Sequence, residues 1–273
     1  MIGVMRKVLS LLTLVRYAEA MSQTLPDPVL NAEFSAQVKS IDEFINRFNG
    51  TESNPEVKND SNFYRNNLIA LFDYQMKHDG LTDAAFRKMI SDFVQQIEVQ
   101  NAKIKLTDSS MWAEAKSSVK VDGRSRTLTL LLRSETYNKD RVRWTIAGAK
   151  GVLKACGIDT AQYYAISPVE HEVHFMSLDG IFTNNRKGIM GYKSKECNID
   201  ELSVFFSFVM LGKIEFCAVS HVTFHCLEVP NYAFTIEEQG RRGLNSGWLI
   251  TNLIPLSDNN KNQYINKLLH YEN

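Results

Sequence analysis

The stretch that decides the fold is MWAEAKSSVKV-DG-RSRTLTLLLR, residues 111–133. Apolar and polar side chains alternate from Met111 to Val121, which is the period of a β-strand with one buried face. Asp122-Gly123 is typical of a two-residue hairpin turn, because both residues tolerate a positive φ. We therefore expect antiparallel strands to follow at Thr127 to Arg133 and at Arg141 to Ala147.

Three helices are predicted before this meander. Ser40-Ile41-Asp42-Glu43 has the form of a capping box, and Asn49-Gly50 ends the helix that it begins. A second helix is expected from Phe63 to Met76. The third follows the N-cap Thr82 and carries one apolar stripe, formed by Phe86, Met89, Ile90, Phe93, Val94 and Ile97. Helices followed by an antiparallel meander are typical of the α+β class.

The same order of elements is predicted again in the second half. One helix is expected from the capping box at Ser167 to about Phe182, and another from Asn198 to Gly212. The strands that follow are expected at Glu215 to Glu228, Tyr232 to Glu238 and Trp248 to Leu253, and a short helix closes the chain around Tyr264 to Leu269.

A shift of 104 residues aligns the two meanders and places Trp144 on Trp248. This shift predicts a structural duplication, with a first α+β domain at residues 35–155 and a second at residues 165–273. Each half is expected to bury its own Trp against its own helices.

The segments Arg143-Trp144-Thr145-Ile146 and Gly247-Trp248-Leu249-Ile250 each place an aromatic side chain in the last strand of a meander. Helices before such a meander resemble the nuclear transport factor 2-like superfamily, a cystatin-like α+β cone. The resemblance implies helices packed on curved antiparallel sheets in two similar halves, as a tandem in an exported bacterial protein. Members include enzymes, binding modules and dimerisation domains. The family's catalytic pair matches no positions here, so the resemblance assigns no catalytic residue.

Composition excludes several classes of partner. Lys plus Arg number 31 and Asp plus Glu number 31, so the chain lacks the positive charge that a nucleic-acid binder needs. No stretch approaches the ~20 apolar residues of a membrane helix, so no transmembrane segment is expected in the mature protein. The four cysteines are too few for a disulfide scaffold and are expected to be buried free thiols.

Residues 1–20 have the features of a signal peptide. Arg6 and Lys7 precede the apolar run Val8 to Val15, and Ala18-Glu19-Ala20 supplies the small residues that a signal peptidase reads. A periplasmic or secreted location is therefore predicted. Arg16 interrupts the pattern, and the alternative is a cytoplasmic protein with a frayed N-terminal helix.

Two groups of histidines in the sequence could form a metal site or a ligand pocket. His171, Glu172 and His174 lack the i, i+4 histidine spacing of a zincin helix, so a polar helix face is the better interpretation. His221 and His225 lie on a predicted strand, where they and Thr223 share one face.

His221, Thr223 and His225 are therefore the candidate ligand-pocket residues. Val219 has the same parity, which suggests that this face is partly covered. Cys217 also has this parity and would be a third ligand if the face bound a metal. The two His lie ~13 Å apart along a straight strand, too far to bind one ion, so neither a metal nor a cofactor is expected.

Two classes of function remain. The first is a non-catalytic module of the cell envelope that binds an unknown small molecule or an envelope protein. The second is a small-molecule enzyme that uses a pocket acid or base in the second half, such as His221 or His225. No residue is assigned a catalytic role by the sequence.

Export generates the first prediction. N-terminal sequencing of the protein recovered from its native cells should begin at Met21 or close to it. An intact Met1 or Met5 would show that the apolar run is not a cleaved leader.

Overall fold

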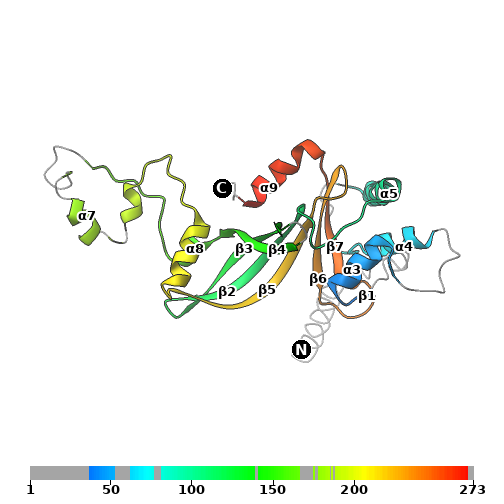
Figure 1. Ribbon diagram of the computed structural model, residues 1–273, viewed down its shortest axis with the longest axis horizontal. Helices are drawn as coiled ribbons and strands as arrows, with labels where there is room; N and C mark the ends of the chain where they lie inside the picture. Colours follow the sequence, from blue (N-terminus) through cyan, green and yellow to red (C-terminus); the bar gives the residue numbers. More distant parts are fainter. Residues whose placement is uncertain are drawn as a thin grey trace, which may run out of the picture.

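A computed structural model describes residues 37–52, 62–76, 81–138, 141–166, 175, 178–184, 186 and 188–269 (Figure 1). Within these ranges the chain forms seven α-helices and one seven-stranded mixed sheet, so the predicted α+β class is confirmed. The predicted signal peptide at residues 1–20 and the cluster around His171 lie outside the described residues.

The two meanders form one sheet, whereas the sequence predicted two. The strands are β1 (Gln37–Val38), β2 (Met111–Val121), β3 (Arg124–Asn138), β4 (Arg141–Lys150), β5 (Ile214–Cys226), β6 (Tyr232–Gln239) and β7 (Ser246–Pro255). Their order in the sheet is β1-β7-β6-β5-β2-β3-β4, and every pair is antiparallel except β1 with β7. The antiparallel ladder between β2 and β5 joins the halves.

In Figure 1, α3, α4 and α5 lie at one end of the sheet, α8 lies at the other, and α9 lies over the sheet between them. They are α3 (Ile41–Asn49), α4 (Phe63–Ala70), α5 (Asp83–Gln100), α6 (Val152–Ala155), α7 (Leu178–Asn184), α8 (Glu201–Met210) and α9 (Lys261–Leu269). Ser40 and Thr82 cap α3 and α5 as predicted, and Gly50 ends α3 in the left-handed region. Asp200 caps α8 in place of the predicted Asn198, because its carboxylate accepts from the backbone of Leu202 and Ser203.

Helix α4 ends at Ala70, six residues before its predicted end. The backbone beyond it runs along the outer edge of β7, where Ile250 N donates to Leu71 O at 2.8 Å and Asp73 N donates to Ile250 O at 2.9 Å. Strand β1 covers the start of the same edge at Gly247, whose φ is +82° and where a Cβ would collide with the backbone of Val38. An edge strand exposes backbone groups that must find partners, and this need outweighs the helical pattern after Ala70.

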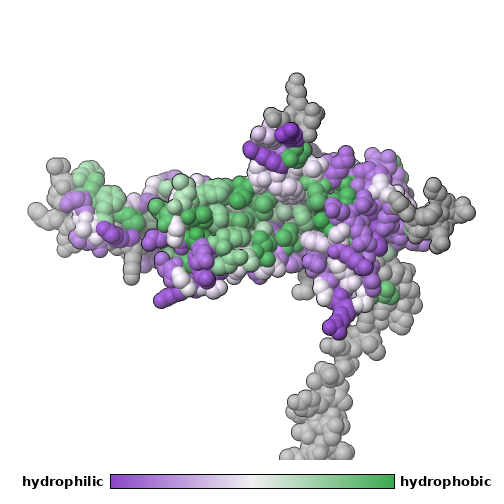
Figure 2. All heavy atoms as spheres, turned by 60° about the horizontal axis from the view of Figure 1, so that its bottom comes forward, coloured by the Kyte–Doolittle hydropathy of each residue, from purple (hydrophilic) through white to green (hydrophobic). Residues whose placement is uncertain are grey.

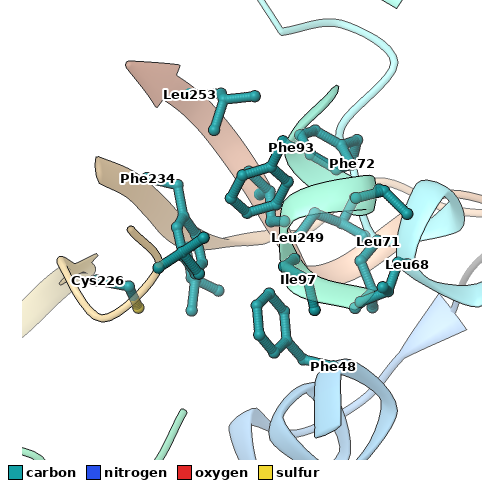
Figure 3. Close-up of a cluster of buried hydrophobic side chains, with 14 of the residues drawn as sticks. Phe48, Leu68, Leu71, Phe72, Phe93, Ile97, Cys226, Phe234, Leu249 and Leu253 are labelled. Carbon is teal, nitrogen blue, oxygen red and sulfur yellow. The ribbon is translucent and has the colours of Figure 1, made fainter. Parts of the chain in front are cut away.

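The main core combines helices of the first half with strands of the second half (Figure 3). Phe93 of α5 is fully buried, and its ring lies 5.7 Å from Phe72 and 5.4 Å from Phe234 of β6. The apolar stripe of α5 was expected to cover the meander of its own half. It packs instead on β6 and β7, because the β2–β5 ladder places those strands at the same end as the first three helices.

A second core shows the converse arrangement. Phe205 of α8 packs with Ala115, Val119 and Leu128, which belong to strands of the first half. Residues 35–155 and 165–273 therefore complete each other's cores. Trp144 and Trp248 lie on one face of the shared sheet, partly buried on either side of Phe224, with ring centroids 6.1 and 5.6 Å from it.

The two faces of the sheet differ in chemistry. We call the side that carries Glu114, Thr223 and His225 the histidine face, and the side that carries Ala115, Val222 and Phe224 the apolar face. Helix α9 packs on the histidine face, where Leu268 and Tyr264 contact a cluster that contains Trp112. Helix α8 and helices α3 to α5 pack on the apolar face at its two ends.

The core generates the second prediction. Phe93→Ala should lower the free energy of unfolding by about 3–5 kcal/mol, because it removes a fully buried ring from an aromatic cluster. Gln95→Ala, at an exposed position on the same helix, should change it by less than about 0.5 kcal/mol. Urea titration of both variants measures the difference, and equal midpoints would contradict the assigned core.

Candidate functional site

The three candidate residues on β5 share one face, as their alternation predicted. His221 lies opposite Lys116 of β2, Thr223 lies opposite Glu114, and His225 lies opposite Trp112. Cys226 points to the other side and is fully buried in the main core, again as predicted.

Two β-bulges change the face of the residues that precede them. The register slips at Ser220 and again at Cys217, so that Val219 lies opposite Ser117 and Phe216 lies opposite Val119. Each extra residue shifts the alternation by one position. Val219 therefore lies on the apolar face, and the expectation that it shares the face of His221 is wrong. Cys217 is the extra residue of the second bulge and has no partner on β2.

A polar cavity of about 530 Å³ opens on the histidine face. Strands β2, β5, β6 and β7 contribute carboxylates, hydroxyls and amides to it, and the segment after α4 closes one side. The residues that matter below are Glu114, Thr223, His225, Thr235, Glu237 and Asn252. His221 is not among the lining residues, since it lies at the rim with 42% of its side chain exposed.

His225 and Asp73 are the two most buried titratable groups in the cavity wall, each with 6% of its surface exposed. Nδ1 of His225 lies 2.8 Å from the hydroxyl of Tyr264 on α9. Its Nε2 lies 3.6 Å from Glu114 Oε2, which is too long for a hydrogen bond, and it has no other hydrogen-bond partner among the described residues. A buried polar atom without a partner is uncommon and costs free energy, so this nitrogen is a candidate binding position.

Glu114 carries a negative charge that its neighbours stabilise. Lys150 Nζ donates to Glu114 Oε1 at 2.8 Å. The imidazole of His225 first, and then the ammonium of Lys150, hold the pKa of Glu114 at about 2 against the opposing effect of burial. The carboxylate is thus ionised at any physiological pH.

Tyr264 fixes the orientation of the imidazole. Burial, and then the charge of Glu114, raise the pKa of Tyr264 to about 12, so its hydroxyl keeps its proton. In the tautomer that carries its proton on Nε2, next to the Glu114 carboxylate, Nδ1 of His225 accepts from the tyrosine hydroxyl. The N–H at Nε2 is then the free donor of the site.

A second carboxylate lies on the other side of Thr223. Thr223 Oγ1 donates to Glu237 Oε1 at 2.8 Å, and His221 Nε2 lies 3.5 Å from Glu237 Oε2. The imidazole of His225 therefore lies between the carboxylates of Glu114 and Glu237, with Thr235 and Asn252 beyond them. A third carboxylate, Asp73, also lines the cavity and forms an ion pair with Arg241 at 2.6 Å.

Sequence reasoning missed Glu114, Lys150 and Tyr264. They come from β2, β4 and α9, and no local spacing connects them to His225. The pairing of β2 with β5 would have identified Glu114. The sequence suggested two separate meanders, in which these strands do not pair.

Other features of the described chain bear on function. Within its ranges no group of three or more His, Cys, Asp or Glu side chains is arranged to hold a metal ion, and no helix has the length and apolar character needed to cross a membrane. All four cysteines are free thiols, and only Cys226 is fully buried, while Cys197 and Cys217 are exposed.

Comparison with protein-family models, with curated proteins and with solved structures found no match. The resemblance to the nuclear transport factor 2-like superfamily therefore stays a prediction.

The charge of Glu114 generates the third prediction. Its pKa is lowered on folding, so its contribution is fully present above its unfolded value near 4.5 and disappears as the pH falls towards 2. Glu114→Gln should cost about 3 kcal/mol at pH 7 and much less at pH 2, because the shift corresponds to ~1.4 kcal/mol per pH unit. Urea titrations between pH 2 and pH 7 measure this.

The matched control is Glu238→Gln, which alters an exposed carboxylate on β6 outside the cavity. Its free energy of unfolding should follow that of the wild-type protein at every pH. A constant difference between Glu114→Gln and wild type from pH 7 to pH 2 would contradict the lowered pKa.

Proposed function

We propose that the protein is a binding module for a small, neutral, polyhydroxylated molecule, such as a monosaccharide or a polyol. The observation that carries the proposal is the buried Nε2 of His225, which has no hydrogen-bond partner among the described residues and lines an open polar cavity. The ligand supplies that partner.

The space beside His225 Nε2 and Glu114 Oε2 favours a hydroxyl group of the ligand. An atom placed between His225 Nε2 and Glu114 Oε2 accepts from the imidazole N–H and donates to the carboxylate. A hydroxyl does both, whereas an ammonium group cannot accept and a carboxylate cannot donate. Glu114 and Glu237 also repel an anionic ligand.

The other residues of the cavity wall also favour a ligand with several hydroxyl groups. Hydroxyls of Thr235 and Thr251 and the amide of Asn252 offer both donors and acceptors to further hydroxyl groups. A volume of about 530 Å³ lies within the range of small-molecule sites, which is ~300–1,000 Å³.

Two further parts of the proposal rest on the sequence. The leader-like residues 1–20 support an exported protein of the cell envelope. The symmetric order β4-β3-β2 followed by β5-β6-β7 supports a duplicated meander of nuclear transport factor 2-like descent.

A second candidate is an enzyme in which His225 Nε2 acts as the general base or acid on a bound hydroxyl. The Tyr264–His225–Glu114 arrangement favours it, because an imidazole held between two oriented groups can transfer a proton. Turnover of a bound sugar at a rate that His225→Gln lowers by about 10²-fold or more would place catalysis ahead of simple binding.

The fourth prediction tests binding. Saturation-transfer NMR against glucose, galactose, mannose, xylose, inositol and glycerol should detect at least one bound compound. His225→Phe should abolish its binding, because a phenyl ring offers no donor to the ligand and leaves Glu114 Oε2 without the imidazole beside it. His221→Ala, at the exposed rim, should keep its affinity within about threefold, a difference of under 1 kcal/mol.

Two outcomes would contradict the proposal. One is the absence of binding by every compound at millimolar concentration. The other is binding that His225→Phe leaves unchanged, since the ligand would then occupy another site.

A further inference from the structure

One edge of strand β5 is open along the part of the strand that precedes Thr223. Strand β6 pairs with β5 only from Thr223 to Cys226. Between Ile214 and Val222 the described residues provide β5 with one neighbour, β2, and no strand on the other side. Glu215 to His221 are all exposed. A row of backbone N–H and C=O groups about nine residues long is thus available for pairing.

Large apolar side chains are exposed along this open edge and on the neighbouring helix α8. Phe216 and Val219 of β5 are 44% and 48% exposed. On α8, Phe206, Val209 and Met210 are 42%, 40% and 86% exposed, and Leu211 beyond it is 70% exposed. Figure 2 shows a broad hydrophobic area along the middle of the molecule.

Helix α8 is apolar around most of its circumference, with Ser203 and Ser207 forming a narrow exposed polar strip, so its apolar surface is wider than one covered face requires. Phe205 and Leu202 pack on the sheet, whereas the opposite side of the helix meets no described element. Exposed apolar surface of this extent on a soluble protein marks an interface.

We infer that the protein forms a symmetric dimer in which β5 pairs antiparallel with β5 of a second copy of this chain. Only an extended strand satisfies the open backbone groups of β5, which excludes a helix or a lipid surface as the occupant of the edge. An antiparallel strand is its own complement about a two-fold axis. The zero formal charge of the chain means that two copies do not repel each other.

The bulges of β5 produce a self-complementary apolar row. They place Phe216, Val219 and Val222 on the apolar face at intervals of three residues. In a two-fold register centred on Val219, that residue faces its own copy and Phe216 faces Val222 of the other chain. The three side chains then form one continuous strip across the junction.

The charges in this register are also complementary. Glu215 and His221 both lie on the histidine face. Pairing about Val219 brings Glu215 diagonally beside His221 of the second copy, within the ~7–8 Å that such neighbours span. The carboxylate of Glu215 is available for this contact, because its side chain is 69% exposed and its ion pair with Lys120 is a long, exposed one at 3.6 Å.

Helix α8 extends the interface beyond the strand edge. A stable interface buries about 800 Å² on each partner, which a nine-residue edge alone does not supply. Helix α8 ends four residues before Ile214, which is the first residue of β5. In the register centred on Val219, that end lies beside the half-buried Phe224 on the apolar face of the copy. Met210 and Leu211 are the residues closest to this junction in sequence.

The experiment is a mass measurement of the full chain by light scattering and by sedimentation. We expect a particle of twice the 31.1 kDa chain mass. Val219→Lys should raise the dissociation constant by about 100-fold, since each dimer would then hold two lysines face to face, a change of ~2.7 kcal/mol. Val99→Lys, at a position that is 70% exposed on α5, should leave the dimer unchanged.

Cross-linking provides a second readout that does not depend on tolerating a charge. In a chain carrying Cys197→Ser and Cys217→Ser, Val219→Cys should form an intermolecular disulfide under mild oxidation, because the residue faces its own copy. Val99→Cys in the same background should not. Circular dichroism and melting temperature establish that each variant is folded.

A monomer at all concentrations tested would overturn the inference and leave the edge to a strand from another protein. A dimer that Val219→Lys does not weaken, or a Val219→Cys chain that fails to cross-link, would also overturn it. None of these results bears on the binding of polyhydroxylated ligands at His225, which lies on the opposite face.

Discussion

The rest of the structure depends on the antiparallel ladder between β2 and β5. It runs from Met111 opposite Cys226 to Val121 opposite Ile214, and it converts two meanders into one sheet. Because side chains directly opposite each other share a face, this register alone sets Glu114 beside Thr223 and near His225. It also brings the strands of the second half to the helices of the first. The cores, the cavity and the open strand edge all follow from it.

This dependence on a distant pairing has a kinetic consequence. The contact between Cys226 Sγ and Met111 Sδ joins residues 115 positions apart, and the main core cannot close before it forms. Contacts of such sequence separation are slow to form, because chain entropy is lost before they stabilise the fold. The helices α3 to α5 expose their apolar stripes until β6 and β7 arrive. We therefore expect the two halves to fold as one cooperative unit.

Local patterns predicted the elements well and their assembly poorly. The Met111 to Val121 strand, the Asp122-Gly123 turn and the Thr82 cap each depend on neighbouring residues, and the structure contains all three. The early end of α4 at Ala70 and the bulges at Ser220 and Cys217 result from pairing with β7 and β2, which no local window contains. For the same reason, His225 could be proposed from strand parity, whereas Glu114, Lys150 and Tyr264 could not.

The two faces of β5 show how one strand can serve two roles. On the histidine face the ring of His225 is covered by α9, whose Tyr264 supplies both a hydrogen bond and part of an apolar cluster with Trp112. Helix α9 has only nine residues and depends on that cluster for its position. Loss of the Tyr264–His225 contact thus loosens the helix, and loss of the helix exposes the imidazole to water. We therefore expect the polarity of the cavity and the docking of α9 to be parts of one equilibrium, in which local opening of α9 would lower the affinity of the proposed His225 site without unfolding the sheet.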